Sequence, residues 1–325
     1  MNNIKVIPVR DAVGNVLAHD MTQIIKGVSK KAKFKKGHII REEDIDTLIS
    51  MGKEHIYILE LDDETYHEND AAIVLSNLCL GNNIESSDIS EGRINLKSKV
   101  EGVLKINTAL LEKINGVDGV IISTKFNNKV VKEGDIVAAT KIVPLFIDKI
   151  SIKTCEEFAK NDKLLEVIPF KNLKAGVIIT GNEVFDKKIE DGFKDFLPAR
   201  LKEYGTEIIS YEYVKDDSNE IASAIEKLIG KVDVVLCAGG MSVDPDDATP
   251  YGIRKSSTEI ITYGTPVLPG AMFMVSYRDK TPILGLPGSV MFYEKTVFDF
   301  IMPLIAIEEK ITKTHIVSMA HGGLL

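Results

Sequence analysis

The chain has 325 residues, of which 44% are hydrophobic and 27% are charged, and its formal net charge at pH 7 is −8. This length predicts two or three domains, and the acidic balance argues against a general nucleic-acid binder, because contact with phosphates needs a basic face. No apolar run approaches the roughly 20 residues of a membrane helix, and the first residues lack the apolar core of a signal peptide. We therefore expect a cytoplasmic protein without nucleic-acid or membrane partners. Cys79, Cys155 and Cys237 lack metal-ligand or redox spacing and are expected to be small buried hydrophobes.

Residues 1–70 are predicted to form a first segment. The run from Glu42 to Gly52 predicts a helix, because its acidic residues lie at the amino end, where they complement the helix dipole, and Gly52 supplies the C-cap. A strand is expected over residues 55–59.

Residues 71–168 are predicted to form a middle α+β segment. It opens with a helix over residues 71–80, and Asn127-Asn128 is a hairpin turn signal. Short strands are expected over residues 100–104, 117–123, 129–131 and 136–143. No residue pattern in this segment points to a particular chemistry, so we expect it to be structural or to form one wall of a cleft.

Residues 169–311 alternate between strand and helix patterns, which indicates parallel strands joined by crossover helices. Strands are predicted over residues 175–180, 207–214, 232–237, 271–277 and 281–286, and helices over residues 193–204, 218–229 and 289–301. We expect Ser218 to cap the second helix. The predicted fold class is α/β, with a C-terminal parallel-sheet domain preceded by smaller mixed α/β and β-rich segments. Residues 312–325 are expected to be a tail.

Ligands of parallel sheets bind beyond the carboxyl ends of the strands, and four such ends carry loops of similar chemistry. These loops are Thr180-Gly181-Asn182-Glu183, Lys215-Asp216-Asp217, residues 239–250 and Gly285-Leu286-Pro287-Gly288. Each loop also has a plain alternative as a turn or a helix cap, with Asp216, Asp217, Asp247, Thr249 or Ser289 as capping residue. If the strands are parallel, the four loops meet at one edge of the sheet.

The loop over residues 239–250 is the most informative of the four. Gly239 and Gly240 let the backbone approach a ligand closely, and Asp244, Asp246 and Asp247 follow within a few residues. Backbone N–H groups at a glycine turn suit an anion, and grouped carboxylates suit Mg²⁺. The loop therefore predicts an anionic ligand that carries or needs a metal ion.

The order and spacing of these loops resemble the molybdopterin-binding fold shared by molybdopterin molybdenumtransferases, molybdopterin adenylyltransferases and gephyrin. The resemblance covers roughly residues 170–305 and includes Pro269-Gly270. Residues 11–20, with the region from Phe34 to Gly52, are similar to the opening of the molybdenumtransferases, which favours that branch.

The resemblance implies that adenylylated molybdopterin receives molybdate while AMP leaves. Glu183, Asp217 or its neighbour Asp216, and Asp247 match the acidic positions that would hold Mg²⁺ and take part in catalysis. It also implies a homodimer and contacts with other cofactor-biosynthesis proteins. The residues implied to bind the cofactor are Thr180, Gly181, Asn182, Asp216, Gly239, Gly240, Met241, Ser242, Thr249, Pro269, Gly270, Leu286, Pro287 and Gly288.

Two departures from the family pattern weaken capture of an oxyanion by simple Coulomb interaction. Ala271 stands where the family has the lysine of Pro-Gly-Lys-Pro, and Asp244 stands where it has a glycine. Arg254, Lys255 or the basic loop from Lys30 to Lys36 could compensate, although we expect that loop to be a solvated surface.

Two other functions stay open at this point. One is a molybdopterin-binding carrier or regulatory protein without catalysis, which the departures at Ala271 and Asp244 suggest. The other is a nucleotide pyrophosphatase, because residues 245–249 also resemble the competence-damage protein family.

Overall fold

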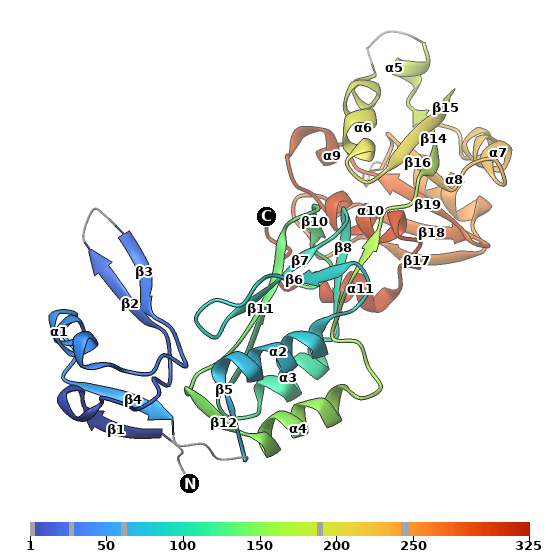
Figure 1. Ribbon diagram of the computed structural model, residues 1–325. Coiled ribbons are helices and arrows are strands. Elements are labelled where there is room, and N and C mark those ends of the chain that lie inside the picture. The colour runs from blue at the N-terminus through green and yellow to red at the C-terminus, as the bar shows by residue number, and fades with distance from the viewer. Residues whose placement is uncertain (1–3, 26–28, 60–63, 187–190, 242–246) are drawn as a thin grey trace. The chain divides into compact units, whose positions relative to one another are not determined.

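The computed structural model describes residues 4–25, 29–59, 64–186, 191–241 and 247–325 (Figure 1). They form two compact units. The first contains residues up to 98, 106–125 and 135–166, and the second contains 99–105, 126–134 and 167–325. Two short pieces of the middle third of the chain therefore belong to the second unit. The four-segment division of the chain stays a prediction.

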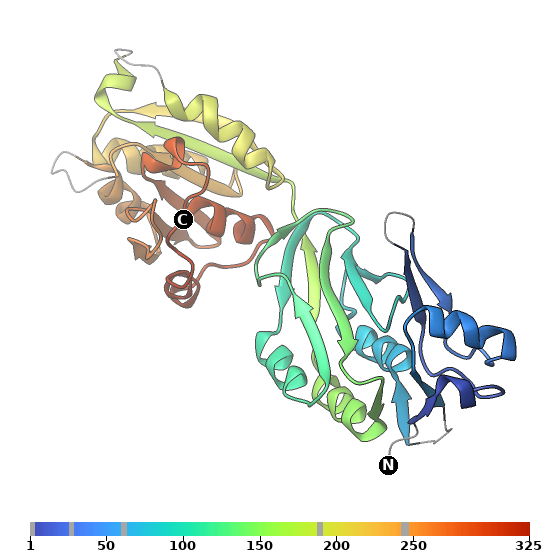
Figure 2. The same ribbon diagram turned by 90° about the vertical axis from the view of Figure 1, so that its left-hand side faces the viewer.

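The beginning of the first unit has a small core of its own (Figure 2, blue). Its elements are β1 (Ile4–Pro8), a 3₁₀ turn (Val9–Asp11), β2 (Met21–Ile25), β3 (Ser29–Phe34), α1 (Glu42–Ser50) and β4 (His55–Leu59). β1 pairs antiparallel with β4, and β2 with β3. The helix predicted from Glu42 is confirmed as α1, which ends at Ser50, and Gly52 follows it with φ 75°, a left-handed conformation that favours glycine. Leu48 of α1 packs in this core with Phe34.

The rest of the first unit is an antiparallel sheet with helices on it. Its elements are β5 (Thr65–His67), α2 (Glu68–Cys79), β6 (Ile84–Ser86), β7 (Ile94–Ser98), α3 (Thr108–Asn115), β9 (Val120–Thr124), β11 (Ile136–Ile142), β12 (Phe146–Asp148) and α4 (Lys149–Ala159). The four-stranded sheet has the order β6-β7-β11-β9. α2 is the predicted helix at residues 71–80, and it begins three residues earlier because the His67 side chain accepts a hydrogen bond from the backbone N–H of Asn69. α3 and α4 were not predicted.

The second unit is built on a six-stranded sheet. Its elements are β14 (Leu173–Thr180), α5 (Asn182–Phe185), α6 (Gly192–Lys202), β15 (Thr206–Val214), α7 (Ser218–Leu228), β16 (Val234–Ala238), α8 (Thr249–Ser256), β17 (Glu259–Tyr263), β18 (Met274–Arg278), β19 (Thr281–Leu286), α9 (Ser289–Phe292), α10 (Phe298–Ala306) and α11 (Lys313–Ser318). The strand order is β15-β14-β16-β19-β18-β17. A smaller sheet has the order β10-β8-β13, from Val130–Val131, Gly102–Ile106 and Leu165–Pro169.

Four neighbouring strands of the large sheet are parallel. β14 runs parallel to β15 and β16, and β16 runs parallel to β19, whereas β18 is antiparallel to both of its neighbours. The predicted α/β class and the predicted C-terminal parallel sheet are therefore confirmed, with two antiparallel strands added at one edge.

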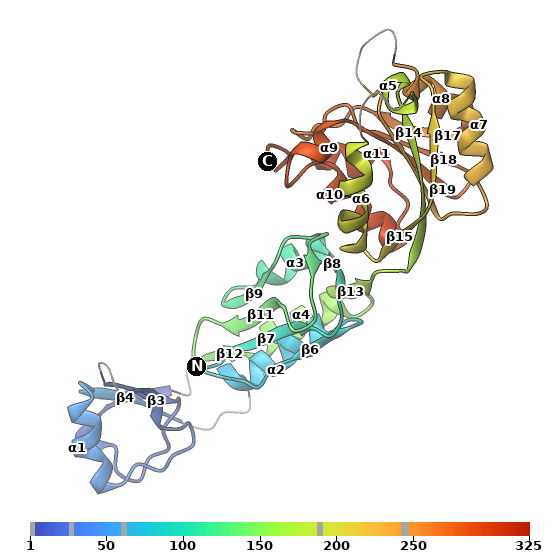
Figure 3. The ribbon, with the colours of Figure 1, turned by 90° about the horizontal axis from the view of Figure 1, so that it is seen from above.

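Helices cover both faces of this sheet (Figure 3). Val177 and Ile179 face one hydrophobic core with α6 and α10, whereas Ile178 between them faces a second core with α7 and α8. All three side chains are at most 3% exposed. A strand that is buried on both sides reads as a continuous apolar run, which explains why the sequence pattern identified it.

Two details of the predicted elements are wrong. The predicted helix over residues 289–301 is two helices, α9 and α10, because the Asp299 carboxylate accepts a hydrogen bond from the backbone N–H of Thr296, and the Thr296 hydroxyl accepts one from Phe298. These contacts start a new helix. The cap of α7 is Asp217 rather than Ser218.

The three cysteines are buried thiols, as predicted. Burial raises the pKa of Cys79 to about 12 and that of Cys155 to about 11. No helix within the described ranges is long and apolar enough to span a bilayer.

Two phenylalanines close together in sequence test the packing. Phe298 is fully buried in the core below the sheet, whereas Phe292 is 79% exposed. We expect Phe298→Ala to destabilise the second unit by about 3–5 kcal/mol, because it removes a buried ring and leaves a cavity. Phe292→Ala is the matched control and should change stability by at most about 0.5 kcal/mol. Urea denaturation of the full chain measures both, and equal effects would contradict the packing described.

Candidate functional site

The carboxyl ends of the four parallel strands lie at one edge of the sheet. In the register, Thr180 is opposite Val214, and Ala238 is opposite both Ile179 and Leu286. The loops that follow β14, β15, β16 and β19 therefore begin at one rim. We call the described residues 180–183, 215–217, 239–241, 247–249 and 286–288 the rim.

Hydrogen bonds between buried threonines join two of these loops. The Oγ1 atoms of Thr180 and Thr249 are 2.8 Å apart, and the Thr180 hydroxyl also donates to the carbonyl of Ala238 at 3.3 Å. Thr180 is 3% exposed and Thr249 is fully buried. The end of β14 is thereby fixed to the end of β16 and to the start of α8.

The two glycines after β16 are required by close packing. Gly239 has φ 101°, and a Cβ atom there would collide with the carbonyl oxygen of Thr180. Gly240 has φ 51°, and a Cβ atom there would lie 3.0 Å from both Asp216 Oδ1 and Thr249 Oγ1. Only glycine combines these dihedral angles with this space, so the expected glycine turn is present and lies against Asp216.

Asp216 has the most unusual environment of the rim carboxylates. Its Oδ2 accepts a hydrogen bond from the backbone N–H of Asn182 at 3.3 Å, and the Asn182 side chain accepts one from the backbone N–H of Asp216 at 3.4 Å. Its Oδ1 is buried and has no hydrogen-bond partner among the described residues. Burial raises the pKa of Asp216, and the negative charges of Asp247 and Glu183 raise it further.

Asp217 lies on the other side of the turn and caps α7. Its Oδ1 accepts hydrogen bonds from the backbone N–H groups of Asn219 and Glu220, at 2.8 and 3.0 Å. These bonds lower the pKa of the exposed Asp217. The capping alternative therefore describes Asp217, and Asp216 is the carboxylate that lies against the glycine turn.

Glu183 and Asp247 act on Asp216 from two other loops. Glu183 is exposed on the short helix α5, and Asp247 is partly buried just before α8. Asp247 also raises the pKa of Tyr263, after the larger effect of burial. Three predicted positions, Glu183, Asp216 and Asp247, thus share one electrostatic environment. Ser242, Asp244 and Asp246 lie outside the described residues.

Met241 and the loop after β19 form the apolar part of the rim. Met241 is 4% exposed and packs over Gly285, where its side chain takes the space of a Cβ atom. Its carbonyl accepts a hydrogen bond from the Tyr263 hydroxyl at 3.4 Å. Leu286 is fully buried, Pro287 is buried, and Gly288 is exposed at the start of α9.

Gly270 contacts residues outside the rim. Gly270 has φ 120° and lies against Val297, and its carbonyl accepts a hydrogen bond from the Thr265 hydroxyl at 3.3 Å. A cavity of about 510 Å³ adjoins this loop. It is lined by Gly264, Thr265, Pro266, Ala271, Lys313, Ile316, Val317 and Ala320.

Lys313 gives that cavity a positive charge next to Ala271. Its ammonium group donates to the Thr262 hydroxyl at 3.0 Å, and that hydroxyl donates to the carbonyl of Gly264 at 2.6 Å. Tyr263, the next residue after Thr262, instead donates to the carbonyl of Met241 and packs against the second core, whereas Ile316 near Lys313 packs in the first. The sequence did not indicate Lys313, because it lies in the segment predicted to be a tail.

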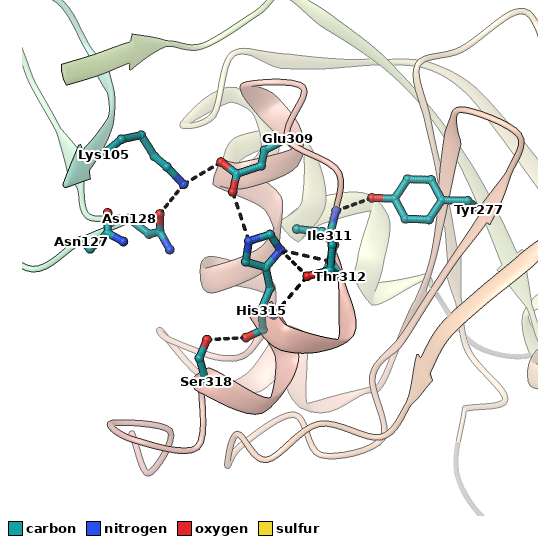
Figure 4. Close-up of polar contacts among 9 residues, drawn as sticks. All are labelled: Lys105, Asn127, Asn128, Tyr277, Glu309, Ile311, Thr312, His315 and Ser318. Atoms are coloured by element: carbon teal, nitrogen blue, oxygen red, sulfur yellow. Dashed lines mark hydrogen bonds and ion pairs between the residues drawn. The ribbon is translucent and has the colours of Figure 1, made fainter. Parts of the chain in front are cut away.

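A network of polar side chains holds the helix that carries Lys313 (Figure 4). Lys105 donates to Glu309 and to Asn128, both at 2.7 Å, and His315 Nε2 lies 3.2 Å from Glu309. The backbone N–H of Thr312 donates to His315 Nδ1 at 3.1 Å. Because Nδ1 accepts, the neutral imidazole carries its proton on Nε2, toward Glu309. The start of α11 is thereby fixed within the second unit.

The two single cations that the sequence analysis named, Lys255 and Arg254, make other contacts. Lys255 donates to the side chains of Ser218 and Asn219, at 2.7 and 2.8 Å, beside the Asp217 cap. The guanidinium of Arg254 lies over the ring of Tyr263, 5.9 Å from its centroid. Of the two, Arg254 is the one next to the rim.

The carboxylates of the rim are suited to a metal ion that a ligand helps to hold. Within the described residues, no three His, Cys, Asp or Glu side chains lie close enough to form a complete protein metal site. Mg²⁺ is usually bound through one or two carboxylates, with phosphate oxygens and water completing its shell. The partnerless Oδ1 of Asp216 and its neighbour Asp247 fit that donor set.

Sequence comparison agrees with this geometry. Residues 176–306 match the family described as a probable molybdopterin binding domain, and residues 6–60 match a domain family of unknown function. The first match confirms the resemblance stated for residues 170–305. The similarity of residues 11–20 to the opening of the transferases stays a prediction.

Several relatives share this domain. A molybdopterin molybdenumtransferase of Staphylococcus aureus (strain Mu50) is 27% identical over 131 residues, which cover 38% of this chain and 31% of the relative. A molybdopterin molybdenumtransferase of Nostoc sp. is 26% identical over 150 residues, which cover 43% and 34%. The chain thus spans about a third of the length of these relatives.

Solved structures show weaker similarity. The molybdopterin biosynthesis enzyme MoaB from Thermus thermophilus is 21% identical, with 41% of this chain and 89% of that chain covered and a TM-score of 0.34. The tungsten cofactor synthesizing protein MoaB from Pyrococcus furiosus is 21% identical, with 42% and 91% covered and a TM-score of 0.32.

We expect substitutions of the two adjacent aspartates, Asp216 and Asp217, to change the stability of the fold in opposite directions. A carboxyl group with a raised pKa in the folded state loses stability as the pH rises from its unfolded value through its folded value. At pH 7 the charge of Asp216 therefore opposes folding, and Asp216→Asn should raise the urea midpoint. Asp217 has a lowered pKa, so its charge stabilises the fold above the unfolded pKa, and Asp217→Asn should lower the midpoint at pH 7.

Measuring both variants at pH 7 and pH 3 tests this assignment. Both differences from the parent should shrink at pH 3, below the ordinary aspartate pKa of about 3.9. Asp216 is then mostly protonated in either state, and the contribution of Asp217 decreases as the pH falls from its unfolded pKa toward its lowered folded pKa. A lower midpoint for Asp216→Asn at pH 7 would contradict the environment described for Asp216.

Proposed function

We propose that this protein binds adenylylated molybdopterin and inserts molybdate into it, with release of AMP and with Mg²⁺ required. The observation that carries the proposal is the meeting of Asp216, Asp247 and Glu183 beside the glycine turn at Gly240. This meeting lies in the domain that matches the probable molybdopterin-binding family. The named activity of the transferase relatives supports the reaction.

In this proposal Asp216 and Asp247 hold Mg²⁺ together with phosphate oxygens of the ligand, and Glu183 contributes charge from the exposed side. Bound Mg²⁺ supplies Lewis-acid polarisation of a pyrophosphate. Asp216 suits this role because its buried Oδ1 lacks a hydrogen-bond partner and its raised pKa reflects negative charges that a cation would neutralise. Asp217 serves as a positioning residue, because its cap fixes the start of α7.

The backbone around the glycine turn is proposed to bind the phosphate of the ligand. Gly239, Gly240 and Met241 would offer N–H groups, as glycine turns commonly do toward anions. Ser242 is retained in the proposal from the family resemblance. Thr180 and Thr249 already bond one another, so their part is to hold the turn. Gly181, Asn182 and Leu286-Pro287-Gly288 would line the sides of the site.

Lys313 is proposed to replace the positive charge that Ala271 does not provide. It lines the cavity next to Ala271, and Thr262 fixes its ammonium group. Molybdate is a dianion, and an ammonium group in a partly apolar cavity attracts it more strongly than one in open water. Pro269 and Gly270 would form the neighbouring wall.

A carrier or regulatory role without turnover is the second candidate, and Ala271 is the observation that favours it. The cellular setting is proposed to be the cytoplasm. A homodimer and contacts with other cofactor-biosynthesis proteins are proposed from the resemblance.

The release of AMP tests the proposed reaction. Purified protein with adenylylated molybdopterin, Mg²⁺ and molybdate should release AMP, and EDTA should abolish this release. Asp216→Asn and Asp247→Asn should slow it by about a hundredfold or more, because each removes charge from the metal site. Glu226→Gln, on α7 away from the rim, is the control and should leave the rate unchanged.

Two outcomes separate the alternatives. Tight molybdopterin binding without AMP release would reject insertion and favour the carrier. Release of AMP from NAD or ADP-ribose would indicate the pyrophosphatase instead.

The role of Lys313 is tested separately. Lys313→Gln should raise the KM for molybdate about tenfold, because the anion loses its nearest positive charge, and Lys313→Arg should restore most of the affinity. Lys310→Gln removes a positive charge from the same segment, where Lys310 pairs with Glu259, and serves as the control. An unchanged KM in Lys313→Gln would reject this assignment.

A further inference from the structure

A second cavity lies in the first unit, in the part of the chain that matches the domain family of unknown function. Its volume is about 700 Å³. The end of β3 and the turn after it form one side, and α1 forms the other. Nothing in the proposed cofactor reaction uses it.

Two lysines lie at the end of β3 beside the cavity. Lys33 and Lys35 flank Phe34, which packs in the core with Leu48 and also lines the cavity. Both lysines are exposed and line the cavity. Gly37, with φ 82°, then turns the chain, and the backbone N–H of His38 bonds to the carbonyl of Lys35 at 3.0 Å.

The acidic side chains that line the cavity are already paired. His38 Nε2 lies 2.6 Å from Asp44 Oδ2, and the same oxygen accepts the backbone N–H of Arg41 at 2.9 Å. These hydrogen bonds lower the pKa of Asp44, although burial acts to raise it. Glu43 pairs with the guanidinium of Arg41 at 3.3 Å.

After this pairing, the lysines that line the cavity give it an excess of positive charge. Lys36 lies 3.7 Å from Asp70, and its pKa is lowered by burial. Among the described residues, the ammonium groups of Lys33 and Lys35 have no ion-pair or hydrogen-bond partner. The ammonium groups of Lys33 and Lys35 are exposed on one side of the cavity, beside the imidazole of His38, which is hydrogen-bonded to Asp44. Two positive charges match the charge of a phosphate group.

We propose that the cavity between β3 and α1 binds the phosphate group of a small molecule, with Lys33 and Lys35 as its charged ligands and His38 at its edge. Lys36, half-buried in the same turn, adds to the positive potential. The site is independent of the proposed reaction at the rim, so either proposal can fail without the other.

The His38 imidazole gives a local readout in the full chain. The protein has six histidines, and the spectrum of His38→Gln identifies the His38 signal by its loss. Pyrophosphate, orthophosphate and ADP are titrated in EDTA, which leaves the rim without a metal ion. We expect the His38 signal to shift saturably with at least one of these probes.

Charge-removal variants then locate the binding. The Lys33→Gln/Lys35→Gln double variant should weaken binding about tenfold or more, and the Lys33→Arg/Lys35→Arg variant should restore it. Lys227→Gln/Lys231→Gln removes the same charge from exposed positions of the second unit and should bind as the parent does. The relative affinities for orthophosphate and ADP tell whether free phosphate or a nucleotide is the better ligand.

Three results would overturn the proposal. These are no saturable shift of the His38 signal with any of the three probes, equal weakening in the two glutamine double variants, and full affinity in Lys33→Gln/Lys35→Gln. A His38 shift caused only by a single-stranded RNA oligonucleotide would also overturn it, in favour of a nucleic-acid surface.

Discussion

The close approach of β14 and β16 at their carboxyl ends is the constraint on which the candidate site depends. Gly239 lies directly against the carbonyl of Thr180, and the Thr180 hydroxyl bonds to both Ala238 and Thr249. These contacts hold the loops after β14 and β16 together and place the turn at Gly240 against Asp216. A side chain at Gly239 would separate the strands and remove the geometry that brings the rim carboxylates together.

Electrostatics gives this rim its chemical character. Asp216 is a partly buried carboxylate near further negative charge, and its Oδ1 has no hydrogen-bond partner among the residues that the structure describes. The negative charge of such a carboxylate opposes folding unless a bound cation compensates it. Carboxylates with a raised pKa of this kind are typical of binding sites. Asp217, one residue later, has the opposite environment, with two backbone donors and a lowered pKa. Two neighbouring aspartates thus divide the structural and the proposed functional role.

The parallel sheet and its rim could be predicted because buried strands and glycine turns leave strong local patterns. Apart from Thr180 and Asp233, residues 175–180 and 232–237 are apolar, which matches the burial of these strands on both faces of the sheet. The choice between Asp216 and Asp217 could not be predicted, since a cap position and a site position one residue apart share the same local pattern. Lys313 was missed for another reason, because its place beside Ala271 arises from contacts far apart in sequence.

Two helices of the first unit, α3 and α4, carry sequence patterns that the prediction missed. α3 has a clear signal, since Asn107 caps it through the backbone N–H of Leu110. α4 buries Ile152 and Cys155, which are three positions apart, and exposes residues 156–158, which is a helical spacing. The division of α9 from α10 depends on the side-chain contacts of Thr296 and Asp299, which an apolar periodicity does not register.

The titration of the Asp216 carboxyl carbon by NMR, with Asp216→Asn to assign its signal, tests the central claim most directly. The account predicts a pKa above the ordinary aspartate value in the metal-free protein, and a fall in that pKa when Mg²⁺ and AMP are added together. An ordinary pKa, or one that Mg²⁺ and AMP leave unchanged, would contradict the assignment of this rim as a metal-dependent phosphate site.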